Sequence, residues 1–132
     1  EPIKTTTLEK FINVKPDIHI INGYGPSETT ICSTMYDFTN ENNEYEIVPI
    51  GHPIDNTKIY IMNSDKNILP INTNGEIYIS GDGVGKGYKN NKELTNEKYL
   101  VINGTRMFKT GDIGRWDKNG NIIFVGRNDN QI

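Results

Sequence analysis

Residues 22–30 bring together the residue types that can bind and polarise a ligand. The glycines of this stretch and Pro26 allow a rigid loop, because glycine accepts positive φ and proline fixes φ. Such a loop can aim the ring of Tyr24 at a base, and it can also present the hydroxyl of Ser27 and the carboxylate of Glu28, a magnesium ligand. These residue types indicate a nucleotide with its metal. The alternative is a plain turn, in which Tyr24 is packing and Glu28 begins a helix.

A second carboxylate, Asp112, follows a predicted strand and stands next to a glycine. At that position it can accept two hydrogen bonds from neighbouring hydroxyls, such as those of a ribose. Taken by itself, Thr-Gly-Asp is more simply explained as a tight turn closed by the aspartate. The polar run 126–131 follows the last apolar strand and indicates either a linker or a frayed end.

Other familiar sites are excluded by spacing. The glycines of residues 81–88 recur at every second position, which fits neither a dinucleotide fingerprint nor a P-loop and favours a structural loop with close backbone packing. Two histidines and the single Cys32 cannot build a metal cluster of nitrogen and sulfur ligands. Ser27 follows a proline rather than standing in Gly-x-Ser-x-Gly, so a hydrolase elbow is rejected.

Composition narrows the classes of partner. The formal net charge is −3 and the basic residues are scattered among acidic ones, so we expect no nucleic-acid partner. No apolar run approaches the length of a membrane span, so we expect no membrane association. Cys32 cannot form an internal disulfide, which fits a reducing cytoplasm.

The first third of the chain predicts a helix followed by a strand. Thr6 and Glu9 have the spacing of a capping box, and apolar residues at helical spacing carry the predicted helix to about Val14. Residues 18–21 predict a short buried strand that leads into the loop at residue 22. Periodicity leaves the apolar segment 31–38 open between helix and strand.

From residue 47 onward the pattern becomes β. Short strands are predicted at 58–62, 75–79, 107–109, 114–116 and 122–125, with one or two helical turns within 94–100. Lys-Asn-Gly at 118–120 predicts a hairpin turn, because asparagine and glycine tolerate positive φ. Short strands separated by turns predict a small barrel or packed sheets.

Three motifs in order connect these observations to a known family. Residues 22–28 match Asn-x-Tyr-Gly-Pro-Thr-Glu except that Ser27 replaces threonine and keeps its hydroxyl, and residues 108–112 match Tyr/Phe-Lys/Arg-Thr-Gly-Asp. Residues 126–131 are similar to Gly-Arg-x-Asp-x-Gln. In this order, and across essentially the whole chain, the sequence resembles the adenylation domains of nonribosomal peptide synthetases.

The resemblance implies a role for each matching side chain. Ser27 and Glu28 are the implied catalytic residues, with the Ser27 hydroxyl near the α-phosphate and Glu28 holding Mg²⁺. The implied nucleotide contacts are Asn22 at the base edge, Tyr24 stacked on adenine, Asp112 on the ribose hydroxyls, Phe124 beside adenine and ribose, and Arg127 on the ribose or phosphate side. Phe124 replaces a frequent tyrosine and lacks its hydroxyl.

Further positions match the family's amino-acid pocket and hinge. Gly23, Ile31 and Cys32 stand at positions that line the pocket, and their small or apolar character indicates an uncharged substrate side chain. Asp129 stands at the pivot to a mobile C-terminal subdomain.

The implied fold is α+β and mainly β. It consists of the end of an α/β layer with the nucleotide loop at residues 1–46, a distorted small β-barrel subdomain at 47–126, and the start of a hinge at 127–132. The family's phosphate loop, its substrate-binding aspartate and its catalytic lysine have no counterpart here. We therefore expect a fragment of an adenylation domain that is not active alone.

The implied reaction joins an amino acid to ATP, giving an aminoacyl adenylate that passes to phosphopantetheine. The expected cofactors are ATP, Mg²⁺ and the phosphopantetheine of a carrier domain. The expected partners are the amino-acid substrate, a peptidyl carrier domain, the rest of the adenylation domain and neighbouring synthetase modules. The alternatives are a fragment of an acyl-acid, aryl-acid or D-alanine carrier-protein ligase, or a non-catalytic β module.

Overall fold

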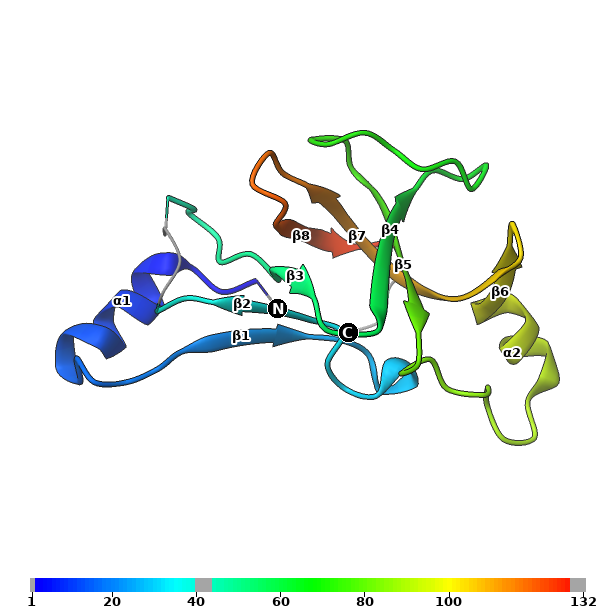
Figure 1. Cartoon of the computed structure of the whole chain (residues 1–132), viewed down its shortest axis with the longest axis horizontal. Helices are drawn as coiled ribbons and strands as arrows, with labels where there is room; N and C mark the ends of the chain where they lie inside the picture. The colour runs from blue at the N-terminus through cyan, green and yellow to red at the C-terminus, as the bar shows by residue number, and fades with distance from the viewer. Residues whose placement is uncertain (1, 40–43, 129–132) are drawn as a thin grey trace.

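The computed structural model describes residues 2–39 and 44–128 (Figure 1). In chain order its elements are α1 (Thr5–Val14), β1 (Ile21–Tyr24), the 3₁₀ turn η1 (Ser27–Thr29), β2 (Thr34–Asp37), β3 (His52–Pro53), β4 (Thr57–Met62), β5 (Gly75–Gly81), α2 (Lys92–Lys98), β6 (Tyr99–Ile102), β7 (Thr105–Trp116) and β8 (Ile122–Arg127). Neither helix of this described part is long and apolar enough to cross a membrane.

Helix α1 lies beside the smaller sheet, in which β1, β2 and β3 pair in that order (Figure 1). Its apolar side chains Leu8 and Ile12 pack against the buried cluster that contains Tyr36 of β2 and Phe38, which follows β2. The helix predicted to end near Val14 is confirmed. The predicted capping box is wrong, because the helix begins at Thr5 after an N-cap at Lys4 that makes no side-chain cap bond.

The strand predicted at residues 18–21, with a loop from residue 22, lies further along the chain in the structure. Residues 18–20 are not in a strand, and β1 begins at Ile21 and includes Asn22, Gly23 and Tyr24. The segment 31–38, left open by periodicity, supplies β2, which pairs antiparallel with β1. This pairing fixes the backbone of Tyr24, and the loop proper begins only at residue 25.

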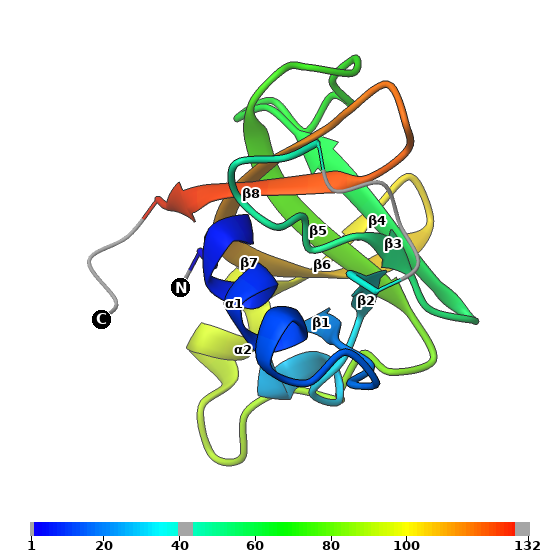
Figure 2. The same cartoon turned by 90° about the vertical axis from the view of Figure 1, so that its left-hand side faces the viewer.

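The larger sheet is organised by β7. This twelve-residue strand pairs with β5 along one edge, while its other edge pairs first with β6 and then with β8. The two predicted strands 107–109 and 114–116 are therefore one continuous strand. The predicted hairpin turn at 118–120 is confirmed between β7 and β8. Figure 2 shows β8 running across the direction of β4 and β5.

The two sheets are joined by a backbone bridge. Ile122 accepts a hydrogen bond from the Ile50 amide at 2.9 Å and donates one to the Gly51 carbonyl at 3.0 Å. The predicted α+β, mainly β fold is confirmed. The word barrel fits only loosely, because the strand pairings among residues 2–39 and 44–128 do not close into a ring. The boundaries predicted at residues 46 and 126 stay predictions.

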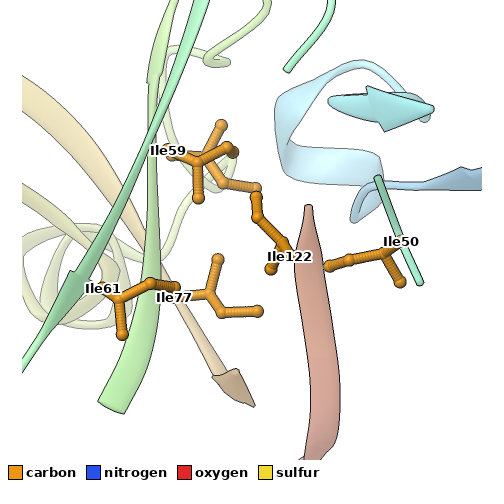
Figure 3. Packing of buried hydrophobic residues seen from close by; sticks show 6 residues of the cluster. Ile50, Ile59, Ile61, Ile77 and Ile122 are labelled. Atoms are coloured by element: carbon orange, nitrogen blue, oxygen red, sulfur yellow. The ribbon is translucent and has the colours of Figure 1, made fainter. Parts of the chain in front are cut away.

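The main core lies where this bridge meets the larger sheet. Figure 3 shows Ile122 of β8 reaching between Ile50 and the isoleucines of β4 and β5. Ile122 and Ile77 are fully buried. Burial of these branched aliphatic side chains holds the Ile50 segment, which leads into β3, against the larger sheet, so the cluster stabilises the position of the smaller sheet relative to β7.

We predict that Ile122→Ala destabilises the protein by about 2–5 kcal/mol, because the lost methyl groups leave a cavity between the sheets. The free energy of unfolding from urea denaturation measures this loss. The control is Ile68→Ala, which removes the same atoms from a side chain that is 66% exposed. Equal losses in the two variants would contradict the placement of Ile122 in the core.

Candidate functional site

Asp112 lies at an irregularity between β5 and β7. Glu76 pairs with Ile113 and Tyr78 pairs with Lys109, so three residues of β7 face one residue of β5. Bulges of this kind redirect a side chain away from the regular alternation of a strand. Gly111, at the centre, has a φ of 79°, a conformation that favours glycine.

Side chains satisfy the backbone of this bulge. The Thr110 hydroxyl donates to the Ile77 carbonyl at 2.7 Å and accepts from the Asp112 amide at 3.0 Å. The Gly111 amide donates to Glu76 Oε1 at 3.1 Å. Hydrogen bonds to the Gly111 and Asp112 amides therefore fix the backbone around Asp112, and this backbone sets the direction of its carboxylate.

The Asp112 carboxylate joins three strands. Tyr24 Oη of β1 donates to Oδ2 at 2.5 Å, and Arg127 Nη1 of β8 donates to Oδ1 at 2.7 Å. Arg127 is opposite Asp112 in the β7–β8 register. Burial, and then the charge of Asp112, raise the pKa of the Tyr24 hydroxyl far above its usual range, so Tyr24 remains a donor.

A cavity of about 270 Å³ opens at this junction. All five predicted nucleotide contacts line it together with Gly23, and the full lining is Pro2, Ile3, Asn22, Gly23, Tyr24, Val48, Ile50, Asp112, Phe124 and Arg127. The Tyr24 and Phe124 rings lie 6.2 Å apart between centroids and are tilted by 46°. The cavity thus combines two aromatic rings with a buried carboxylate and a guanidinium.

Asn22 is partly engaged in holding the fold. Its Nδ2 donates to the Pro49 carbonyl at 2.7 Å. The side-chain amide therefore ties β1 to the segment before β3. Its predicted role at a base edge stays a prediction that rests on the amide oxygen, which is the acceptor end of the group.

Ser27 and Glu28 lie outside the lining of this cavity, in the 3₁₀ turn that follows the β1 part of the motif. Ser27 is exposed. Glu28 Oε1 accepts a hydrogen bond from Tyr88 Oη at 2.6 Å. Burial raises the pKa of Tyr88, and Glu28 raises it further, so the hydroxyl remains a donor and fixes the Glu28 carboxylate.

The glycine-rich loop explains how Tyr88 reaches Glu28. The Gly85 amide donates to the Glu28 carbonyl at 2.8 Å, and a Cβ on Gly83 would lie 2.8 Å from the Thr29 carbonyl oxygen. This agrees with the predicted structural loop whose glycines allow close backbone packing. Tyr88 was not predicted as a partner of Glu28, although this tyrosine ends the same glycine-rich run.

The three predicted pocket residues lie at the base and the end of the loop. A Cβ on Gly23 would lie 3.4 Å from Cys32 Sγ, so these two residues are adjacent. The side chain of Ile31 is 77% exposed and its φ is 72°, a conformation that is rare for a β-branched residue and is found at functional sites. The predicted hinge residue Asp129 lies outside the described residues.

The donor set around Glu28 fits magnesium only together with a nucleotide. Within residues 2–39 and 44–128, no three or more His, Cys, Asp or Glu residues gather as a metal cluster. Magnesium is commonly held by one or two carboxylates plus the phosphates of a substrate. Glu28 fits that role as a single carboxylate with a fixed orientation.

With this geometry in place, comparisons with known proteins define the class. The family model described as AMP-binding enzyme matches residues 1–89, and the chain belongs to this family. Within the family the chain is a segment of an adenylation domain of the type found in nonribosomal peptide synthetases.

Individual relatives support this assignment. The chain is 45% identical to bacitracin synthase 3 of Bacillus licheniformis over 128 residues, and 42% identical to tyrocidine synthase 1 of Brevibacillus parabrevis over 121 residues. These matches cover 95% and 89% of the chain but only 2% and 11% of the relatives. The solved structure of PA1221, an NRPS protein containing adenylation and PCP domains, matches all of the chain and 28% of its own with a TM-score of 0.90 and 28% identity.

We predict that stability falls at alkaline pH through a tyrosine beside this site. Burial, and then Glu76, raise the pKa of Tyr78 from 10.0 to about 12. The folded state favours the neutral hydroxyl of Tyr78, because it raises the pKa of this group. The contribution of Tyr78 to the free energy of unfolding is therefore fully present below pH 10 and is lost as the pH rises toward 12. The measurement is the free energy of unfolding between about pH 9 and pH 12, in wild type and in Tyr78→Phe. The free energy of unfolding of Tyr78→Phe should fall less steeply with rising pH than that of wild type. Identical slopes in the two proteins would contradict the raised pKa of Tyr78.

Proposed function

We propose that the protein containing this chain activates an amino acid with ATP, forming an aminoacyl adenylate that is passed to the phosphopantetheine thiol of a carrier domain. The observation that carries the proposal is the buried Asp112 carboxylate, held by Tyr24 and Arg127 at the wall of the cavity. Tyr24 of the smaller sheet and Asp112 and Arg127 of the larger sheet all line this cavity, so both sheets contribute to the proposed nucleotide site. The adenylation and PCP domains of the similar PA1221 support the carrier partner.

In the proposed complex the ribose hydroxyls donate to Asp112. The two oxygens of a carboxylate together offer about four lone-pair sites, so ribose binding can add to the contacts with Tyr24 and Arg127. Arg127 balances the charge of Asp112 in this buried place. Adenine contacts the Tyr24 and Phe124 rings, since stacking of a base on an aromatic face is favourable whatever the base.

The chemical step joins two anions. A carboxylate oxygen of the amino acid attacks the α-phosphorus of ATP, the bond from that phosphorus to the bridging oxygen breaks, and pyrophosphate leaves. This step needs positioning and charge neutralisation more than covalent catalysis. Mg²⁺ held by Glu28 supplies charge neutralisation when bound. The exposed Ser27 hydroxyl donates to the α-phosphate.

The substrate is proposed to be an uncharged amino acid. Gly23, Ile31 and Cys32 supply no charged group, and Ile31 presents its aliphatic side chain outside the cavity that holds the proposed nucleotide. The remaining walls are proposed to come from the rest of the adenylation domain. A hinge at Asp129, neighbouring synthetase modules and a cytoplasmic location belong to the same proposal.

The decisive test is amino-acid-dependent exchange of labelled pyrophosphate into ATP by the full-length protein. The panel contains amino acids, D-alanine, fatty acids and aryl acids. Exchange with one uncharged L-amino acid supports the proposal. Exchange only with a fatty or aryl acid or with D-alanine would assign the corresponding ligase instead, and no AMP binding at all would indicate a non-catalytic β module.

We predict that Asp112→Ala weakens ATP binding by about tenfold or more, because hydrogen bonds to a charged group contribute roughly 1.5–3 kcal/mol each. The KM for ATP in pyrophosphate exchange measures the change. Glu9→Ala, an exposed carboxylate on α1, is the control and should leave this KM unchanged. A KM for ATP that does not move in Asp112→Ala would refute the ribose contact.

We predict that Glu28→Gln lowers kcat on the order of 100-fold while the Kd for AMP changes little, because its carboxylate neutralises charge that develops in the chemical step. Tyr88→Phe is the matched control, since it removes the donor to Glu28 but keeps the carboxylate. Its loss in kcat should be much smaller. Equal losses of kcat would show that Glu28 acts only through packing against the glycine-rich loop.

A further inference from the structure

We infer that Glu76 is a positioning residue that aims Asp112 at the ribose by holding the amide of Gly111. The inference rests on the proposed function, since it concerns the same nucleotide site. Glu76 lies on β5 and does not line the cavity. Its connection to the site is the hydrogen bond of 3.1 Å from the Gly111 amide to its Oε1.

The bulge creates the need for this acceptor. Residues 110–112 face Ile77 alone, so the regular ladder between β5 and β7 is interrupted at the residue before Asp112. A buried amide without an acceptor gives up its hydrogen bond to water and gains none in return, so leaving it unpaired destabilises the fold. Glu76 supplies a side-chain oxygen in place of a ladder carbonyl, which keeps Gly111 at its positive φ and the bulge in place.

Both oxygens of Glu76 have cationic or polar neighbours. Oε2 lies 3.9 Å from the Lys109 ammonium, and the side chain of Glu76 is only 13% exposed. Burial, and then the negative charge of Glu76, raise the pKa of the neighbouring Tyr78 hydroxyl. The low exposure of Glu76 and the bond from the Gly111 amide favour one orientation of this carboxylate, which keeps its oxygen toward Gly111.

Loss of Glu76 should act on one part of the site. Without this acceptor, the backbone at Gly111 should change conformation so that its amide finds another partner. The change would move Asp112, the next residue, whose carboxylate accepts from Tyr24 and Arg127. Asp112 would then meet the ribose hydroxyls poorly. Ser27 and Glu28 belong to a separate turn, so the catalytic groups should be unaffected.

The test compares AMP with 2′,3′-dideoxy-AMP, which lacks both ribose hydroxyls. The Kd of each nucleotide is measured by calorimetry with the full-length protein. The ratio of the two Kd values reports recognition of the hydroxyls, and partial unfolding of a variant does not alter it. In Glu76→Ala we expect the preference for AMP to fall by about tenfold, with the Kd for 2′,3′-dideoxy-AMP nearly unchanged.

Two further variants separate positioning from charge. Glu76→Gln keeps an oxygen that can accept from Gly111, so it should recover most of the preference for AMP. Lys109→Met removes the ammonium near Oε2 and leaves the acceptor, so it should retain the preference. If Glu76→Ala does not fold, Glu76→Asp replaces it, because the shorter side chain keeps the charge but withdraws from Gly111.

A double variant completes the design. In an Asp112→Ala background, Glu76→Ala should cause no further loss of preference for AMP, because the group that it positions is gone. Equal weakening of both nucleotides by Glu76→Ala, or an undiminished preference, would overturn the inference while leaving the proposed ribose contact intact. If wild type itself shows no preference for AMP, the proposed ribose contact fails and the inference falls with it.

Discussion

The sharing of one buried carboxylate between two donors is the interaction on which the site depends. Asp112 accepts from Tyr24, 88 residues earlier in the chain, and from Arg127 in the neighbouring strand. A buried charge without partners would cost far more than a lost hydrogen bond, so the three side chains are stable only together. Their meeting requires β1 to face β7 at one distance, which the isoleucine core between the sheets fixes.

Hydrogen bonds from a tyrosine hydroxyl to a carboxylate also join other segments that are distant in the sequence. Tyr88 donates to Glu28, and Tyr45 donates to Asp117, across separations of 60 and 72 residues. In each case burial and the carboxylate raise the pKa of the tyrosine hydroxyl, so the proton stays on the donor at neutral pH. A rigid ring that ends in a hydroxyl can cross between elements with little loss of side-chain entropy, which suits it to hold loops in place.

The sequence predicted those features that depend on neighbouring residues. The end of α1 at Val14 and the hairpin turn at 118–120 follow from local spacing, and five of the residues that line the cavity were singled out by motif resemblance, namely Asn22, Tyr24, Asp112, Phe124 and Arg127. The bulge at Gly111 could not be predicted in this way, because it results from how β5 and β7 register against each other. The extent of β1 was missed for a similar reason, since a glycine-containing segment joined a strand only through its pairing with β2.

The motif at residues 22–28 divides into two parts, and each part is held in place by contacts with a different segment of the chain. Its first part is a strand, and Tyr24 is fixed there by the β2 ladder and by Asp112. Its second part is a 3₁₀ turn, and Glu28 is fixed there by a loop that follows β5 of the larger sheet. Because the two parts are held by different segments, a substitution that loosens one set of contacts leaves the other in place. Under the proposed function, recognition of the base and ribose can therefore vary independently of the groups at the phosphates, although both sets of groups belong to one short motif.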